Sequence, residues 1–394
     1  MTGDFEQYYD ELTRLLLAQN GRIEQNYALL SKELSQILSP YTLRDTLTPK
    51  QEKELVKKIE AVLEKHGQRL TSDIEQSIRK AWDLAEDHSD QFILKVLGVA
   101  TIAQLGTSTL SKLFNRPVAD INEFKLSIKV DFKTGTGPIK ITPEKQAGLA
   151  AKLRDLFKVK RNSAPFEAYS GTLNLSSRVW NLEKNNLEII KQFIRQAVAK
   201  GESAQSLSRN LKQLLNNPEA LFRRVRDKEG LLRLSSRAKA YHPGQGVYRS
   251  AHQNAMRLAG TEISRAYRMA ENNRWSQNPM VVGKLIRPSQ TNHPIRDICD
   301  DLKGNYPKDF VWGGWHPQCR CMALPILRTE EELNEYEDKL LSGEDLPETP
   351  SRNEVTKTPQ QFNEWISSNK KRIPGMKSVP YFISDNPQVV KDLL

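Results

Sequence analysis

The feature that most constrains this chain is a concentration of sulfur and imidazole side chains between residues 293 and 321. That stretch holds every cysteine of the chain and two of its six histidines: Cys299, Cys319, Cys321, His293 and His316. Thiolates and imidazoles are the ligands that bind zinc in tetrahedral structural sites. We therefore predict a structural Zn²⁺ ion held by the three cysteines and His316, with His293 or Asp297 as substitute ligands.

The spacing of these ligands sets conditions on such a site. Cys319 and Cys321 are separated by one residue, so the chain must turn sharply for both sulfur atoms to reach one ion. We expect Cys299 to come from a separate loop, with Gly304 allowing the chain to turn back. The alternative is a pair of loops held by hydrogen bonds, in which the cysteines pack as small apolar residues. A catalytic metal would need an open coordination position and a nearby base, and the sequence reveals neither.

Composition excludes several classes of protein. Of 394 residues, 38% are hydrophobic and 27% are charged, and the mean hydropathy is −0.61, which favours long solvated helices with small cores. No run approaches about 18 apolar residues, so no membrane span is predicted. Acidic residues stand where a signal peptide needs positive charge, which predicts synthesis in the cytoplasm. The small, odd number of cysteines argues against a disulfide framework.

Charge is unevenly distributed along the chain. The net charge is +11 and the pI is about 9.4, and residues 329–348 are strongly acidic. The basic cluster, as we call it, lies within residues 222–239 and comprises Arg223, Arg224, Arg226, Lys228, Arg233, Arg237 and Lys239. Such a cluster favours non-specific contact with DNA or with an acidic partner, and a solvated helix face is the alternative. No aromatic residues are interleaved to stack single-stranded bases.

Hydrophobic periodicity predicts a mainly α chain with small β elements. Apolar residues at helical spacing predict helices over 5–37, 49–87, 92–114, 143–157, 175–201, 203–215 and 247–277, and an acidic helix after 327. Alternation predicts strands over 124–132, 139–141 and 281–286. The predicted architecture is an elongated helical N-terminal region with a small C-terminal domain stapled by the Cys/His residues.

We expect four segments along the chain. They are a helical N-terminal region over 1–115, a strand-turn and helical linking region over 116–246, a core with the Cys/His motif over 247–328, and an acidic linker with a C-terminal tail over 329–394. The sequence contains no phosphate loop of the GxxxxGK[ST] type and no GxSxG motif. It therefore offers no catalytic motif, and we expect no catalytic residue.

The order of motifs is informative beyond the cysteines. RVW at 178–180 is followed by AGTEISRAYRMAENNRW at 259–275, CDDLKG at 299–304 and HPQCRC at 316–321. This ordered set, over about residues 175–325, resembles the minor head proteins of tailed phages, the head-morphogenesis family typified by the Mu F protein. The motif positions that carry the resemblance include Thr261, Glu262, Gly304 and Arg320.

The chain departs from the family pattern at two positions. Gly260 stands where the family has arginine before Thr261 and Glu262, and Arg296 stands where it has the first cysteine of a CxxC pair. If the family's Cys/His set binds zinc, this chain must replace one ligand by His293, Asp297 or water. A single glutamate on a helix is more often an ion-pair or capping partner than a catalytic acid, and we expect the former role for Glu262.

The resemblance implies a structural protein of the phage head or procapsid, made in the bacterial cytoplasm and incorporated into the virion. It implies contact with the portal protein and with capsid or scaffold proteins, and non-specific contact with packaged DNA. The competing hypothesis from another class is a zinc-containing nuclease or toxin-like effector, which would need a general base and a metal-binding carboxylate in one cleft. A simple DNA-binding protein would explain the basic charge but not the acidic segment.

Overall fold

The structure is a computed structural model that describes residues 2–40, 49–96, 164–199, 204–216, 224–226, 232–234, 251–288, 297–342, 350–376 and 379–393. The chain divides into two compact units. Unit 1 comprises Met1–Leu12, Lys80–Ala168 and Ser264–Leu394, and unit 2 comprises Thr13–Arg79 and Tyr169–Ile263. The described part is mainly helical with small antiparallel sheets, which confirms the predicted fold class.

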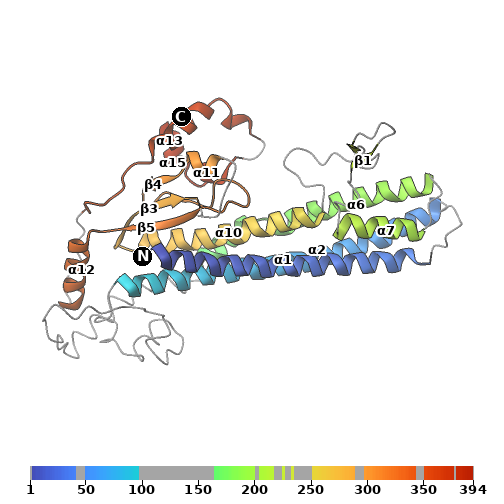
Figure 1. Cartoon of the computed structure of the whole chain (residues 1–394), viewed down its shortest axis with the longest axis horizontal. Helices are drawn as coiled ribbons and strands as arrows, with labels where there is room; N and C mark the ends of the chain where they lie inside the picture. Colours follow the sequence, from blue (N-terminus) through green and yellow to red (C-terminus); the bar gives the residue numbers. More distant parts are fainter. Residues whose placement is uncertain are drawn as a thin grey trace, which may run out of the picture. The chain divides into compact units, whose positions relative to one another are not determined.

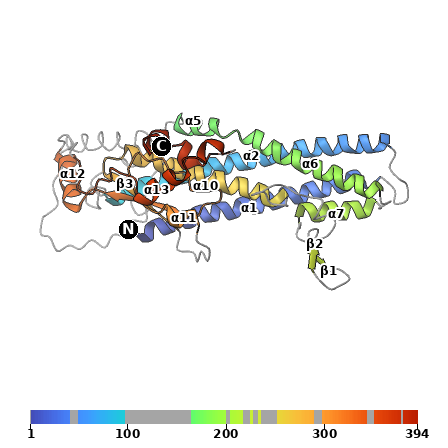
Figure 2. The same ribbon diagram turned by 90° about the horizontal axis from the view of Figure 1, so that it is seen from above.

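Unit 2 is built from long helices packed along their apolar stripes. Its helices are parts of α1 (Thr2–Leu38), α2 (Pro49–Val96) and α10 (Ala251–Gln277), together with α6 (Leu175–Ala199), α7 (Ala204–Asn216) and the end of α5 (Ala164–Thr172). Figure 2 shows α1, α2, α6 and α7 running alongside one another. The stripes repeat every three or four residues, and their fully buried members include Ile23, Leu30, Leu55, Ile59, Leu70, Ile74, Ile190 and Ile194. Burial of these side chains supplies the apolar driving force for the unit.

Polar groups are also buried in unit 2, which the apolar periodicity did not indicate. Nδ1 of His66 lies 3.0 Å from Oε1 of Glu183, and both side chains are almost completely buried. Gly67 allows α6 to approach, because a Cβ atom there would lie 3.1 Å from Cγ of Glu183. The adjacent leucines of α1 differ in burial: Leu29 is 48% exposed, whereas Leu30 is completely buried in the core.

Unit 1 contains a three-stranded antiparallel sheet with β3 (Val281–Arg287) in the centre. It pairs with β4 (Gly304–Tyr306) on one side and β5 (Met322–Leu327) on the other. The short helix α11 (Ile298–Asp301) precedes β4, and α12 (Glu330–Ser342), α13 (Gln360–Asn369), η3 (Ile373–Gly375), α14 (Tyr381–Ser384) and α15 (Pro387–Leu393) follow β5. Figure 1 shows the strands beside α11, α13 and α15.

The hydrophobic core of unit 1 joins the sheet, the cysteines and the C-terminal helices. Phe362 and Phe382 have no exposed surface and belong to the same cluster as Tyr306, Phe310 and Trp315. The ring centroids of Trp315 and Phe382 are 5.2 Å apart, and those of Phe310 and Phe362 are 5.4 Å apart. The segment expected as a C-terminal tail thus supplies aromatic side chains to the core beside the cysteines.

Several predicted features lie outside the described residues. They include the strands over 124–132 and 139–141, the helix over 143–157 and most of the helix over 92–114, of which 92–96 continue α2. Within the basic cluster, β1 (Arg224–Arg226) and β2 (Leu232–Leu234) pair antiparallel, so this described part is not the helix considered as an alternative. Arg224, Arg226 and Arg233 lie in these strands, whereas Arg223, Lys228, Arg237 and Lys239 lie outside the described residues. Among the described residues, every helix is too short or too polar to cross a bilayer.

A candidate metal centre

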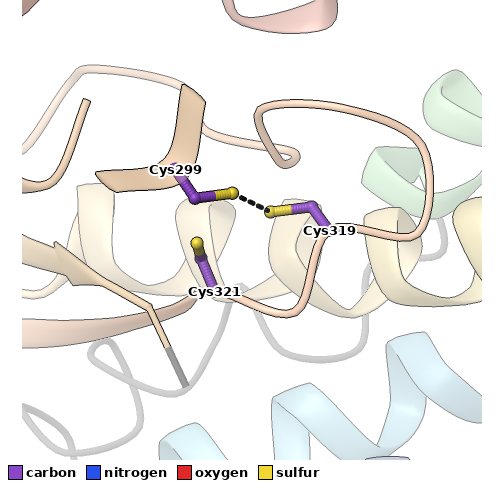
Figure 3. A group of neighbouring side chains, drawn as sticks. All are labelled: Cys299, Cys319 and Cys321. Carbon is purple, nitrogen blue, oxygen red and sulfur yellow. Dashed lines mark hydrogen bonds between the residues drawn. The ribbon is translucent and has the colours of Figure 1, made fainter. Parts of the chain in front are cut away.

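Three buried thiols converge in unit 1. Cys299, Cys319 and Cys321 are at most 7% exposed, and their Sγ atoms all lie within 4.8 Å of one another. Figure 3 shows the three sulfur atoms pointing toward a common point. Sγ of Cys299 lies 3.8 Å from Sγ of Cys319. Two sulfur ligands of a tetrahedral zinc ion are about 3.8 Å apart, because each Zn–S bond is about 2.3 Å long.

Cys299 is presented by a helix, not by the loop that the sequence led us to expect. Asp297 is the N-cap of α11, and its Oδ1 accepts a hydrogen bond from the backbone N–H of Cys299 at 2.8 Å. The backbone N–H of Asp297 in turn donates to Oδ2 of Asp300 at 3.3 Å, which completes a capping box. The cap fixes the start of this four-residue helix and therefore the direction of the Cys299 side chain.

Cys319 follows a tight turn that begins at His316. The backbone N–H of Cys319 donates to the carbonyl of His316 at 3.1 Å. Pro317 occupies the second position of the turn, and Gln318 has a φ of 56°, the pattern of a type II turn. This turn brings the Cys319 sulfur back toward Cys299, and the single residue Arg320, which is exposed, separates it from Cys321.

His316 extends the cluster through its contact with Cys299. Its Nε2 lies 3.1 Å from Sγ of Cys299 and 3.4 Å from Oδ2 of Asp297. Its Nδ1 lies 2.8 Å from the carbonyl oxygen of Pro317 and can only donate to it, which leaves Nε2 as the acceptor in the neutral ring. Metal-binding histidines are commonly fixed in this way by a carbonyl at the other ring nitrogen.

Two groups of side chains can therefore hold a metal ion, and they share Cys299. One is Cys299 with Cys319 and Cys321, and the other is Cys299 with Asp297 and His316. The structure thus places all four predicted ligands, and the substitute ligand Asp297, in one region of unit 1. His293 lies outside the described residues. A single Cys₃His centre needs Nε2 of His316 to come within about 3.6 Å of the other two sulfur atoms.

The thiols differ in acidity because they hydrogen-bond to one another. Hydrogen bonds from Cys299 and Cys321, aided by the charge of Arg268, hold the pKa of Cys319 well below its usual range. The reciprocal hydrogen bonds to Cys319 and Cys321, followed by burial, raise the pKa of Cys299. At Cys321 the bond with Cys299 lowers the pKa, but the bond with Cys319 and burial outweigh it. The hydrogen bonds within the cluster therefore favour ionisation of Cys319 and disfavour ionisation of Cys299 and Cys321.

Arg268, on α10, holds the loop that carries two of the thiols. Its Nη2 donates to the carbonyl oxygens of Cys319 and Cys321 at 2.6 and 2.9 Å, and the side chain is 3% exposed. Gly314 makes room for it: the glycine has a φ of 120°, and a Cβ atom there would lie 2.8 Å from Nη1 of Arg268. Sequence reasoning did not identify Arg268, because no local pattern distinguishes it from the other arginines of α10, such as Arg265 and Arg274.

A second buried polar group fixes the strand and loop around the thiols. Nζ of Lys284, on β3, donates to Oδ1 of Asn272 and to the carbonyl of Phe310, both at 2.7 Å. Asn272 in turn donates to the carbonyl of Trp312 at 2.8 Å. Burial lowers the pKa of Lys284 to about 7 and raises the pKa of Glu271 to about 8. Lys284 and Asn272 thus support the loop from 310 to 321 through the carbonyls of Phe310 and Trp312.

The other motif residues make structural contacts. In unit 2, Glu262 has no exposed surface, and its Oε1 lies 2.8 Å from Nη1 of Arg178. Thr261 donates through its hydroxyl to the carbonyl of Arg257 at 2.6 Å, within α10. In unit 1, Gly304 has a φ of 149°, and a Cβ atom there would lie 2.8 Å from Cγ of Pro359. Glu262 is therefore an ion-pair partner, as expected.

The chain was compared with models of protein families, with curated proteins and with solved structures, and none of the three comparisons found a match.

Proposed function

We propose that this chain is a structural minor protein of a tailed-phage head, associated with the portal and the procapsid, and that a zinc ion staples its C-terminal region. The observation that carries the proposal is the role of the motif residues. Arg178 of the first motif pairs with Glu262 of the second, at 2.8 Å. Arg268, also of the second motif, binds the carbonyls of Cys319 and Cys321 in the last. These motif residues hold segments of the chain together through buried polar contacts.

The donor set supports zinc and a structural role for it. Three thiols and an imidazole are the ligands of closed Cys₃His zinc sites, and all three thiols are buried. The 3.8 Å separation of the Cys299 and Cys319 sulfur atoms matches the edge of a zinc tetrahedron. Bound zinc would link α11 to the loop before β5 and add rigidity to a small core.

Charge and helix length support the proposed partners. The chain carries a net charge of +11, and the basic cluster at 222–239 is a candidate contact with packaged DNA. Helices α1 and α2 are 37 and 48 residues long, which provides extended surfaces for portal, capsid or scaffold proteins. None of these roles requires catalytic turnover, and we place the protein in the virion.

Quantitative mass spectrometry of purified particles and procapsids tests the head assignment. We expect the chain in both at a low, fixed copy number relative to the major capsid protein. Its complete absence from both would overturn the assignment and would direct attention to the nuclease or effector hypothesis.

The zinc is tested separately on the purified, reduced chain. We expect one zinc ion per chain by elemental analysis, and a lower melting temperature after chelation. Cys319→Ser should abolish the stoichiometric zinc, whereas Arg320→Ala, at the exposed neighbour, should retain it. If the chain purifies without zinc and does not bind zinc when it is supplied, the proposed structural zinc site is wrong.

The DNA contact is tested by its salt dependence. Replacing Arg224, Arg226 and Arg233 by glutamine should reduce the slope of log binding constant against log salt concentration by about 0.9 for each lost phosphate contact. An unchanged slope would exclude β1 and β2 from the contact.

A further inference from the structure

Arg268 is a buried cation whose direct partners are all neutral. Its guanidinium donates to the carbonyls of Cys319, Cys321 and Gly313, the last at 3.3 Å from Nη1. The guanidinium carbon also lies 4.7 Å from the centroid of the Trp312 ring. Three carbonyls and an aromatic face orient the group, but they carry no formal negative charge.

The described residues supply no ionised carboxylate to pair with Arg268. Among them, no acidic oxygen lies within 4.0 Å of its guanidinium. Glu271 is the next acid along α10, but burial raises its pKa to about 8, so at neutral pH this carboxyl is mostly protonated. An arginine does not lose its proton in a protein, and an uncompensated buried ion costs several kcal/mol. No carboxylate in the described part of the chain therefore balances the charge of Arg268, and the anion that can balance it is a thiolate of the cysteines whose carbonyls it binds.

A metal–thiolate centre at the three cysteines would supply that anion. A divalent ion with three thiolates and one neutral imidazole has a net charge of −1. Arg268 already binds the backbone of two of the three thiol residues, so its positive charge lies beside the place where the negative charge would form. Given the metal centre proposed above, on which this step rests, we propose that Arg268 is the counter-ion and positioning residue of an anionic Cys₃His metal complex.

The two roles of Arg268 can be separated by substitution. Arg268→Lys keeps the positive charge but cannot bridge the two cysteine carbonyls with one planar group. Arg268→Gln keeps an amide donor for a carbonyl but removes the charge. Arg265→Gln is the matched control, because Arg265 lies one turn earlier on α10 and its charge is already paired with Asp385 at 2.7 Å.

The experiment is a Co²⁺ titration of the reduced, full-length chain and the three variants. Thiolate-to-cobalt charge-transfer and visible ligand-field absorption report the number of sulfur ligands and the tetrahedral geometry, and competition with a chelator gives Zn²⁺ affinity. We expect one tetrahedral, thiolate-rich site in the parent chain and unchanged binding in Arg265→Gln. Arg268→Gln should bind about 10- to 100-fold more weakly, as for other residues that support metal ligands. Arg268→Lys should recover most of that loss.

The outcomes separate this inference from the metal centre itself. If the parent chain binds no metal, the centre fails and the counter-ion role falls with it. If the parent chain binds metal and Arg268→Gln binds equally tightly, the centre stands and the counter-ion role is overturned. Equal losses in Arg268→Lys and Arg268→Gln would assign the effect to the carbonyl contacts and also overturn it. Should Arg268→Gln fail to fold, a folded Arg268→Lys that has lost Co²⁺ binding gives the same refutation.

Discussion

Gly304 is the residue at which a single added methyl group should most clearly destabilise unit 1. Its φ of 149° lies in a region that residues with a Cβ atom rarely adopt, and a Cβ atom there would lie 2.8 Å from Cγ of Pro359. The backbone conformation alone should cost Gly304→Ala about 1–2 kcal/mol. Forcing a methyl group against a proline ring adds about 1–3 kcal/mol, because the ring has few ways to move. We expect a total loss of about 2–5 kcal/mol.

The substitution Gly304→Ala should also change the structure locally, in addition to lowering the stability of unit 1. Gly304 begins β4, whereas Pro359 immediately precedes α13, which carries Phe362 into the core. A collision between the two positions should push α13 away from the sheet and expose Phe362 and its aromatic neighbours. We therefore expect Gly304→Ala to increase proteolysis after residue 350 and to lower the midpoint of chemical denaturation.

Denaturant unfolding of the reduced chain, monitored by circular dichroism and by tryptophan fluorescence, measures the effect. Gly21→Ala is the control, because Gly21 is inside α1 and nothing lies within 4 Å of the position that its Cβ would occupy. That variant should be more stable by about 0.5–1 kcal/mol, the difference in helix propensity. If Gly304→Ala unfolds at the same denaturant concentration as the parent chain, the close approach of Gly304 and Pro359 is wrong.

Three further predictions concern buried charge and the cysteine turn. The pKa of Glu271 is raised from 4.5 to about 8 in the folded chain, so the free energy of unfolding should fall by about 1.4 kcal/mol for each unit that the pH rises between these two values. Glu271→Gln should flatten this decline between pH 5 and 7. Equal slopes of unfolding free energy against pH for the two proteins would contradict the burial of a carboxyl. Gln318→Gly should stabilise unit 1 by up to about 1 kcal/mol, because Gln318 has a φ of 56°, and a lower melting temperature would argue against this turn. Arg178→Ala should destabilise unit 2 by about 1–3 kcal/mol by leaving the buried Glu262 without this cation, and restored stability in the double variant Arg178→Ala, Glu262→Gln would distinguish charge burial from lost packing.

Helix positions were predictable because their signal is local. The stripe of Leu55, Ile59, Leu70, Ile74 and Ile78 could be read directly from the sequence, and all five side chains are buried in α2. Where two leucines are adjacent, the sequence alone does not determine which of them faces the core. Leu29 and Leu30 fit the same stripe equally well, and only the position of the neighbouring helices decides that Leu30 is buried and Leu29 exposed.

The convergence of the cysteines was predictable, but the means by which it is achieved was not. Their number and spacing indicated a common site, since Cys319 and Cys321 are nearly adjacent. Cys299 lies on a capped helix because Asp297 and Asp300 form reciprocal hydrogen bonds. Aspartate residues at this spacing can form such a cap, but the sequence alone does not require it. Contacts between residues far apart in the sequence could be predicted least well.

Arg268 illustrates why long-range contacts carry the information that the sequence lacks. It lies 51 and 53 residues before the two carbonyls to which it donates, and on a sequence basis it is one of several arginines on a polar helix. Once it is buried against Gly314, however, its charge restricts what can form beside it. A fully neutral cluster of thiols would leave that charge uncompensated, whereas either a Cys319 thiolate, whose pKa Arg268 helps to lower, or three thiolates around a divalent ion would balance it. The buried arginine therefore argues against three neutral cysteines packed as small apolar residues, on grounds independent of the ligand spacing that first suggested zinc.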